Sequence, residues 1–257
     1  MTDNPSMLRE AREGSVSILT MDQPVRRNAL AVAMRESLVA AMDRIEADAG
    51  VRAVVLTGAE GNFSAGGDIS GMRAEDVAAG RARFRVTQRL VRGFIGSSKP
   101  IVAAVEGWCV GAGLGMALCC DTIVAGASAR FMAGFNRIGL IPDFGLLHTL
   151  PRRVGEGRAK QIILHPEPIE AAAARDIGLI DRVAADGTAL DDAKALAATL
   201  AEAAPLPIAL SKSWFGQGLD DALEWERNIQ SALFTTEDHA EGKAAFMAKR
   251  APRFAGR

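Results

Sequence analysis

The chain has 257 residues, of which 49% are hydrophobic and 24% charged, and its 30 basic and 31 acidic side chains give a net charge of -1. This balance gives no support to a general nucleic-acid or membrane-surface role, so we expect neither partner. The three cysteines show no CxxC spacing, which argues against disulfides and structural zinc, and a composition without tyrosine excludes any tyrosine acid or base. The first ten residues lack a signal-peptide pattern, so we expect a cytoplasmic protein.

The first hundred residues predict two strands and two helices around a glycine-rich loop. Residues 16–19 and 51–57 are short, β-rich apolar runs typical of strands. Apolar side chains recur with helical spacing over 30–45, and mixed charged and apolar residues do so over 81–94. The loop is the segment 61–68, which holds three glycines.

The middle of the chain repeats the order strand, glycine-rich turn, helix. Residues 101–105 predict a buried strand, and 107–115 a glycine-rich turn leading into a helix that continues through Cys119. Residues 121–125 predict a third strand. The longest uncharged apolar run, 107–120, has 14 residues and is too short and glycine-rich to span a bilayer, so it predicts a buried core helix.

The last third of the chain is expected to be almost wholly helical from Pro168 onward. Pro205 interrupts an alanine-rich run and marks the start of a helical C-terminal segment. Asp221 with Glu224 three residues later is typical of a helix start. Residues 243–257 hold five basic side chains and no acid, so this tail either meets an anion or is a solvated segment.

Several enzyme classes lack their motifs in this sequence. It contains no Gly-x-Ser-x-Gly, Ser-x-x-Lys or His-Glu-x-x-His pattern. The three histidines, His148, His165 and His239, are far apart in the sequence, and we expect each to be exposed or packed. The sequence therefore gives no support to hydrolase triads or to a zinc helix.

The two glycine-rich loops offer exposed main-chain N–H groups. Residues 111–115 have the spacing Gly-x-Gly-x-Gly, which differs from the dinucleotide fingerprint. Small residues at a helix start leave N–H groups free, and the loop 65–68 offers similar groups. Two such loops facing one pocket could form an oxyanion hole, but tight strand–helix packing also selects glycine. Both interpretations stay open at this level.

Four motifs follow one another along the chain. They are Phe63-Ser64-Ala65-Gly66-Gly67-Asp68, Lys99-Pro100-Ile101-Val102-Ala103-Ala104-Val105-Glu106-Gly107-Trp108, Gly111-Ala112-Gly113 with Cys120-Asp121, and a tail from Thr236 to Arg250. Together they resemble the enoyl-CoA hydratase/isomerase (crotonase) superfamily over residues 16–254. The resemblance implies an α/β fold, the crotonase (ClpP-like) spiral of β-β-α units. It divides the chain into a core with the CoA and acyl site over 1–204 and a helical oligomerisation region over 205–257.

The resemblance also implies the ligand and the residues that meet it. The substrate is an acyl-CoA thioester, no separate cofactor is needed because coenzyme A is part of the substrate, and the chain assembles as a trimer or a dimer of trimers. The N–H groups of Gly67 and Ala112 hold the thioester oxygen. The residues implied to line the CoA site are Ala65, Asp68, Ile69, Ser70, and, toward the CoA of a neighbouring subunit, Phe246 and Lys249. Arg26, in a loop before a helix, either approaches the CoA phosphates or is solvated.

The sequence departs from this family at two positions. Hydratases of the family carry two glutamates that activate and protonate water. The position of the first is occupied here by Gly115, and the position of the second by Phe135. Neither residue can transfer a proton, so we expect little hydration by the usual route.

Asp143 is the remaining candidate for acid–base chemistry. In the segment Ile141-Pro142-Asp143-Phe144-Gly145 it matches the position where some isomerases of the family have an acid, and where a family dehalogenase has a nucleophile. Its apolar neighbours should raise its pKa, although it could instead cap a following helix. The first hypothesis is an enoyl-CoA isomerase with Asp143 as proton shuttle. The alternatives are a hydratase or other crotonase reaction with an unidentified acid, and a non-catalytic acyl-CoA-binding protein.

Overall fold

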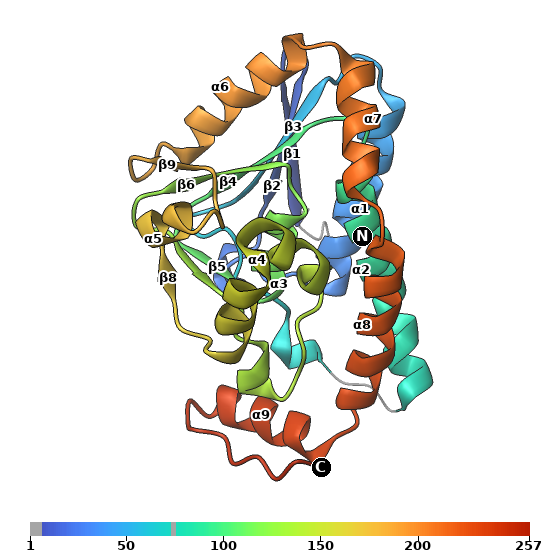
Figure 1. Cartoon of the computed structure of the whole chain (residues 1–257), viewed down its shortest axis with the longest axis vertical. Helices are drawn as coiled ribbons and strands as arrows, with labels where there is room; N and C mark the ends of the chain where they lie inside the picture. The colour runs from blue at the N-terminus through green and yellow to red at the C-terminus, as the bar shows by residue number, and fades with distance from the viewer. Residues whose placement is uncertain (1–6, 73–75) are drawn as a thin grey trace, which may run out of the picture.

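The computed structural model describes residues 7–72 and 76–257, whose strands form two sheets (Figure 1). Within this part of the chain the larger sheet has six strands in the order β1-β2-β3-β4-β6-β9. Only β1 and β2 are antiparallel neighbours in it. Its strands are β1 (Leu8–Glu13), β2 (Val16–Met21), β3 (Ala53–Gly58), β4 (Ile101–Val105), β6 (Thr122–Gly126) and β9 (Arg182–Ala184).

The smaller sheet alternates with the larger one along the chain. It consists of β5 (Trp108–Val110), β7 (Arg130–Met132) and β8 (Ile169–Glu170). The chain passes from β4 to β5 and later from β6 to β7, so successive turns add one strand to each sheet. Helices follow these strand pairs, which confirms the predicted spiral of β-β-α units.

Helices cover both faces of the larger sheet. One face is covered by α6 (Ala189–Glu202), whose buried alanines recur every four residues and pack on valine, isoleucine and alanine side chains of the strands. The other face carries the main core, with α1 (Val32–Ala47), α2 (Val77–Ile95) and α3 (Ala112–Leu118). Alanine allows α6 to approach the sheet closely, since its side chain adds little bulk.

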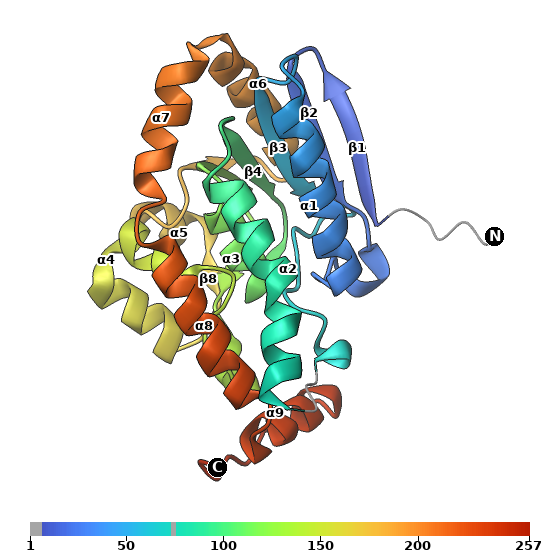
Figure 2. The same cartoon turned by 90° about the vertical axis from the view of Figure 1, so that its right-hand side faces the viewer.

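The helices α7 (Pro205–Phe215) and α8 (Leu219–Leu233) run down one side of the molecule, and α9 (Glu237–Met247) lies at its lower end (Figures 1 and 2). The remaining helices after α3 are α4 (Leu146–Leu164) and α5 (Ala171–Asp176). Short 3-10 helices are η1 (Pro24–Arg26), η2 (Ile69–Gly71) and η3 (Phe135–Ile138). Among the described helices none alone is long and apolar enough to cross a membrane. Only α6 and α7 taken together reach that length and apolar composition, and they are bent by 112° relative to each other.

Several sequence-based expectations for elements were incomplete. The edge strand β1 was missed because all but one of its residues are exposed and polar or small, which leaves no apolar run. The last third also contains β8 and β9, which are too short to produce a periodic signal. The expected core helix over 107–120 is helical only in α3, because β5 precedes it. The helix expected to start at Asp221 begins at Leu219, and Asp221 lies in its first turn.

The basic tail folds back on the acidic start of α9. Arg250 forms a two-pronged ion pair with Glu241, at 2.6 and 2.7 Å, and Arg257 pairs with Glu237 at 2.9 Å. Two of the five basic side chains of the tail are therefore paired within the chain, and the expected contact of the tail with an anion stays a prediction.

Candidate active site

The two glycine-rich loops meet beside the smaller sheet. The Ser64 N–H donates to the Trp108 carbonyl at 2.9 Å, and the Val110 N–H donates to the Ser64 carbonyl at 3.0 Å. A Cβ on Gly66, which has a φ of 99°, would lie 2.7 Å from the Val110 oxygen, and one on Gly113 would lie 2.7 Å from the Ser64 oxygen. Tight packing therefore does require glycine at both positions.

The same contact leaves two main-chain donors free. The N–H groups of Gly67 and Ala112 donate no hydrogen bond to any other described residue. Both residues line one cavity of about 160 Å3. Two unpaired N–H groups at the wall of a cavity can receive a negatively charged oxygen. The two interpretations of the glycines are thus compatible, since the packing brings the free donors together.

Asp143 lines this cavity too. Its side chain is buried, Oδ2 accepts a hydrogen bond from Gln230 Nε2 at 3.3 Å, and Oδ1 has no hydrogen-bond partner among the described residues. Burial raises the pKa of Asp143 to about 6, against the opposing effects of the Arg35 charge, the Gln230 hydrogen bond and the Arg83 charge. A carboxyl with this pKa can accept and return a proton near neutral pH.

Asp143 does not cap the helix that follows it. The N-cap residue of α4 is Gly145, and no side chain from its own segment caps the helix. The Gly145 N–H instead donates to Glu226 Oε2 at 3.0 Å. The capping alternative is therefore wrong, because the carboxyl group of Glu226 from α8 supplies the acceptor.

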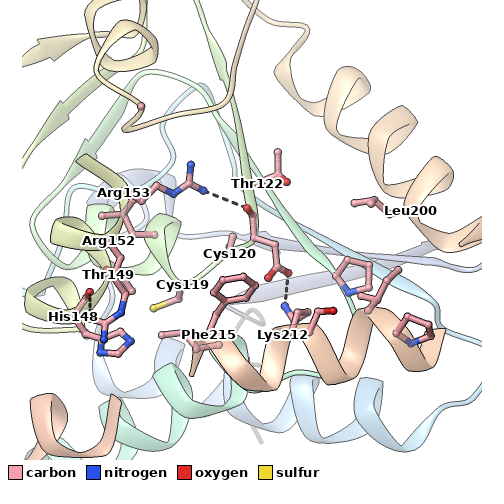
Figure 3. Close-up of a pocket in the computed structure, with 18 residues that line it drawn as sticks. Cys119, Cys120, Thr122, His148, Thr149, Arg152, Arg153, Leu200, Lys212 and Phe215 are labelled. Carbon is pink, nitrogen blue, oxygen red and sulfur yellow. Dashed lines mark hydrogen bonds and ion pairs between the residues drawn. The ribbon is translucent and has the colours of Figure 1, made fainter. Parts of the chain in front are cut away.

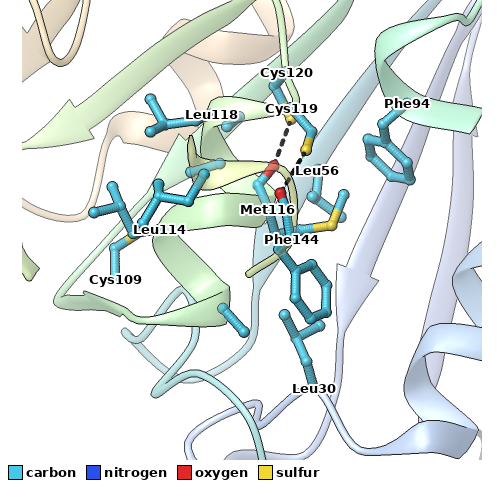
Figure 4. Packing of buried hydrophobic residues seen from close by; sticks show 14 of the residues in the cluster. Leu30, Leu56, Phe94, Cys109, Leu114, Met116, Leu118, Cys119, Cys120 and Phe144 are labelled. Atoms are coloured by element: carbon cyan, nitrogen blue, oxygen red, sulfur yellow. Dashed lines mark hydrogen bonds between the residues drawn. The ribbon is translucent and has the colours of Figure 1, made fainter. Parts of the chain in front are cut away.

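The turn that presents Asp143 is strained and deeply packed. Phe144 has a φ of 58°, which is unfavourable for a bulky side chain, and Gly145 follows with a φ of 70°. Phe144 is fully buried in the cluster that contains Leu30 and Met116 (Figure 4). Its carbonyl accepts a weak hydrogen bond from Cys119 Sγ at 3.6 Å. Packing on both sides holds the turn in this conformation.

Gly115 makes room for this turn. A Cβ at position 115 would lie 2.6 Å from Phe144 Cβ and 3.2 Å from the Asp143 carbonyl oxygen. No side chain fits there unless the turn moves, so the glutamate of the hydratases is sterically excluded from this position. Phe135, at the second glutamate position, is buried and lines the cavity.

Two buried polar residues of α8 were missed by sequence reasoning. Gln230 accepts from the Ile141 N–H at 3.1 Å and donates to the Ile141 carbonyl at 3.0 Å, in addition to its contact with Asp143. Burial and the Asp143 charge raise the pKa of Glu226 to about 8, so it is mostly protonated at neutral pH. Their spacing of four residues puts both on one helix face, and this was the only signal available in the sequence.

A buried arginine was missed as well. Arg35 of α1 lines the cavity and is 4% exposed. Its Nε donates to the Leu30 carbonyl and its Nη1 to Thr87 Oγ1, both at 2.8 Å, and its Cζ lies 5.0 Å from the centre of the Phe144 ring. Burial lowers the pKa of Arg35 to about 10, which leaves it charged at neutral pH.

The expected CoA-site residues are only partly at the cavity. Ala65 and Ile69 line it, whereas Asp68, Ser70 and Arg26 do not. Asp68 caps η2 through the Ser70 N–H and forms an ion pair with Arg26 at 3.0 Å. These three residues therefore stabilise the loop that carries Ala65 and Ile69.

Phe246 lines the cavity of its own chain, because α9 packs against η3. The expected contact of Phe246 and Lys249 with the CoA of a neighbouring subunit stays a prediction. Lys243 Nζ fastens α9 to the η2 loop by donating to the Ser70 and Met72 carbonyls, the latter at 2.7 Å. Lys249 lies beyond the end of α9 and does not reach the cavity.

A larger, open pocket of about 770 Å3 lies under α7 (Figure 3). Asp121 there accepts from the Ile101 N–H at 2.7 Å and pairs with Lys212, so it joins a strand to α7.

His148 is buried beside this pocket, His239 is buried elsewhere with Nδ1 2.9 Å from the Ile138 carbonyl oxygen, and His165 is exposed. Across the described ranges no three His, Cys, Asp or Glu side chains gather as metal ligands would.

Comparison with known proteins gives matches over nearly the whole chain. The family model for enoyl-CoA hydratase/isomerase matches residues 11–257. A putative enoyl-CoA hydratase of Thermus thermophilus is 38% identical over 252 residues, covering 95% of this chain and 99% of the relative. The 1,2-epoxyphenylacetyl-CoA isomerase of Escherichia coli is 34% identical over 253 residues, covering 95% and 97%. The crystal structure of an enoyl-CoA hydratase from Mycobacterium avium subsp. paratuberculosis has a TM-score of 0.88 at 31% identity, covering 97% and 98%.

Proposed function

Because the chain belongs to the enoyl-CoA hydratase/isomerase family, we propose that it is an enoyl-CoA isomerase that uses Asp143 as its proton shuttle. Membership of this family makes it an acyl-CoA-processing enzyme of the crotonase superfamily. The relatives include proteins named hydratases and one named an isomerase, so the choice between the two reactions depends on the residues of this chain.

One observation carries the proposal. Among the described residues that line the cavity, Asp143 is the only carboxyl, and it shares the cavity with the free N–H groups of Gly67 and Ala112. An isomerase needs one group that takes a proton and returns it, together with donors for an enolate oxygen. The water-adding reaction of this family needs two acids, and the cavity supplies one.

The proton transfer balances with this single group. Ionised Asp143 takes a proton from C2 of a 3-enoyl-CoA, and the electron pair of the C–H bond moves into the thioester. The thioester oxygen becomes an enolate anion that accepts hydrogen bonds from the N–H groups of Gly67 and Ala112. Protonated Asp143 then returns the proton to C4, which moves the double bond from C3–C4 to C2–C3. Apolar walls keep water from the intermediate.

The steric environment of Gly115 argues against hydration. A glutamate there would have to displace the turn that carries Asp143, since even a Cβ would lie 2.6 Å from Phe144 Cβ. Phe135 offers an apolar surface at the second position. We therefore rank a hydratase or other crotonase reaction second, and a non-catalytic acyl-CoA-binding protein third.

An absorbance assay separates these functions. With a 3-enoyl-CoA, an isomerase produces the conjugated 2-enoyl thioester, and its absorbance rises. With crotonyl-CoA, a hydratase removes the conjugated double bond, and the absorbance falls. A binding protein changes neither signal. Rapid hydration of crotonyl-CoA that does not depend on Asp143 would overturn the isomerase proposal.

We also propose that the chain assembles as a trimer or a dimer of trimers. Four large apolar side chains of α7 are exposed by 67–72%, namely Leu206, Leu210, Trp214 and Phe215. An exposed apolar stripe of this kind is typical of a subunit interface. A monomer at micromolar concentration in light scattering would contradict the proposal.

A further inference from the structure

Arg35 is a buried charge with one unused hydrogen-bonding edge. Its Nε and Nη1 are bound to the Leu30 carbonyl and to Thr87, and its guanidinium plane lies over the Phe144 ring. Nη2 makes no hydrogen bond to any described residue. The residue is only 4% exposed, so this edge cannot be fully hydrated by bulk solvent. These contacts hold the guanidinium in one orientation and leave the N–H groups of Nη2 without a described partner.

An acceptor bound in the cavity would complete the hydrogen bonds of the Arg35 guanidinium. The cavity that Arg35 lines has apolar walls, among them Val110, Met132 and Leu140. A cation beside apolar surface loses most of its hydration, and an acceptor that completes its hydrogen bonds recovers part of that cost. Such an acceptor has to enter the cavity, since Leu30 and Thr87 already hold the other two nitrogens.

Asp143 does not fill this role. Its Oδ2 is held by Gln230, and its Oδ1 has no hydrogen-bond partner among the described residues. The two charges influence each other's pKa, yet they form no ion pair in the cavity that both line. The other charges facing Asp143 are the half-buried Arg83 of α2 and Glu226 of α8, which is mostly protonated at neutral pH. The substrate's acyl group therefore meets a cation and a proton acceptor at separate points of the wall.

We infer that the acyl group of the natural substrate carries an oxygen acceptor, a carboxylate or a keto group, which binds to the free edge of Arg35. The inference rests on the proposed function in one respect, namely that the cavity holds the acyl group of a CoA thioester. At about 160 Å3 the cavity is smaller than typical pockets for drug-sized ligands, so it suits a short acyl group. Arg35 is in this view a specificity-determining residue.

Binding of saturated CoA esters tests the inference without any chemical step. The matched pairs are adipyl-CoA with hexanoyl-CoA, glutaryl-CoA with pentanoyl-CoA, and 4-oxopentanoyl-CoA with pentanoyl-CoA. Calorimetric titration gives the dissociation constant of each. We expect the oxygen-bearing member of at least one pair to bind about 10-fold more tightly or better, which is the effect of one charge-assisted hydrogen bond in a buried site. The pair that shows the preference identifies the acceptor as a carboxylate or a ketone.

Variants then assign the preference to Arg35. We expect Arg35→Met to bind both members of the pair about equally, and Arg35→Lys, which keeps the charge, to retain part of the preference. Arg89→Met is the matched control, because Arg89 lies exposed on α2 and pairs with Asp43. If Arg35→Met does not fold, Arg35→Lys and the wild-type ratios still decide the question.

Two results would overturn the inference. One is equal affinity of the wild-type protein for both members of every pair, and the other is a wild-type preference that survives in Arg35→Met. The proposed function has a separate test, since saturated esters cannot isomerise. A protein that shows the Arg35-dependent preference but no isomerase turnover supports the inference and refutes the isomerase proposal.

Discussion

Replacing Asp143 with asparagine should abolish isomerisation while strengthening the fold. The amide keeps the size of the side chain and can still accept from Gln230, but it cannot take a proton. Loss of a general base lowers kcat by about 10² to 10⁴. Acyl-CoA affinity should change little, because the N–H groups of Gly67 and Ala112 belong to the main chain.

The expected gain in stability follows from the buried charge of Asp143. Burial raises the pKa of this carboxyl from its ordinary 3.8 to about 6. Between these two pH values the folded protein binds the proton more tightly than the unfolded chain, so the free energy of unfolding falls as pH rises through this window. Above about pH 6 the full cost remains, at most about 3 kcal/mol. The side chain introduced by Asp143→Asn carries no charge, so the variant should avoid this cost at a pH of about 7.5.

Three measurements on each protein test this reasoning: isomerase rate, acyl-CoA affinity and urea unfolding at about pH 5 and about pH 7.5. Wild-type kcat/KM at the lower pH should be about one-tenth of its value at the higher pH, because only about a tenth of a base with a pKa near 6 is then ionised. Asp43→Asn is the control, since Asp43 is exposed and does not line the cavity. A near-wild-type rate in Asp143→Asn would remove Asp143 from the mechanism, and a less stable variant at the higher pH would refute the argument from burial.

Three further predictions concern the surroundings of the site. Gly115→Ala should lower the free energy of unfolding by about 1–3 kcal/mol, because its Cβ collides with Phe144, and unchanged urea unfolding would contradict this. Gln230→Leu should move the acid limb of the pH–rate profile upward by about one pH unit, because Asp143 loses a hydrogen bond that favours its ionised form. An acid limb that does not move would show that Gln230 does not act on the ionisation of Asp143. Leu210→Glu should dissociate the oligomer in light scattering, and an intact trimer would show that α7 is not the interface.

The sequence was most informative where a local pattern determines the structure. The apolar run at 101–105 coincides with β4, and the helical spacings over 30–45 and 81–94 correspond to α1 and α2. In these segments the apolar residues that recur in the sequence are also the residues that are buried, so the sequence pattern predicts the element. The glycine-rich loops were located correctly for a similar reason, since the positive φ of Gly66 and Gly111 limits those positions to glycine.

The polar surroundings of Asp143 could not be predicted in this way. A charged residue in an amphipathic helix is expected on the solvent side, yet Arg35 of α1 is buried because α2 packs over it and Thr87 accepts from its guanidinium. Gln230 and Glu226 act on a turn more than 80 residues earlier in the chain. Such contacts depend on how helices from distant parts of the chain pack together, and the local spacing of apolar residues does not predict that packing. The family resemblance also implies that the segment 71–88 lies around the acyl pocket, and residues 73–75 of this segment lie outside the described part of the chain.

The glycine at position 115 and the acid at position 143 are parts of one structural arrangement. With only hydrogen as its side chain, residue 115 lets Phe144 approach α3 so closely that a Cβ at position 115 would lie 2.6 Å from Phe144 Cβ. Phe144 can then bury its ring and accept from Cys119, which fixes the left-handed turn and turns Asp143 toward the cavity. A side chain at 115 and the present turn exclude each other sterically. Adding a glutamate at that position should therefore displace Asp143 as well as add an acid, so this substitution should not install hydratase activity without moving the carboxyl group on which the proposed isomerase mechanism depends.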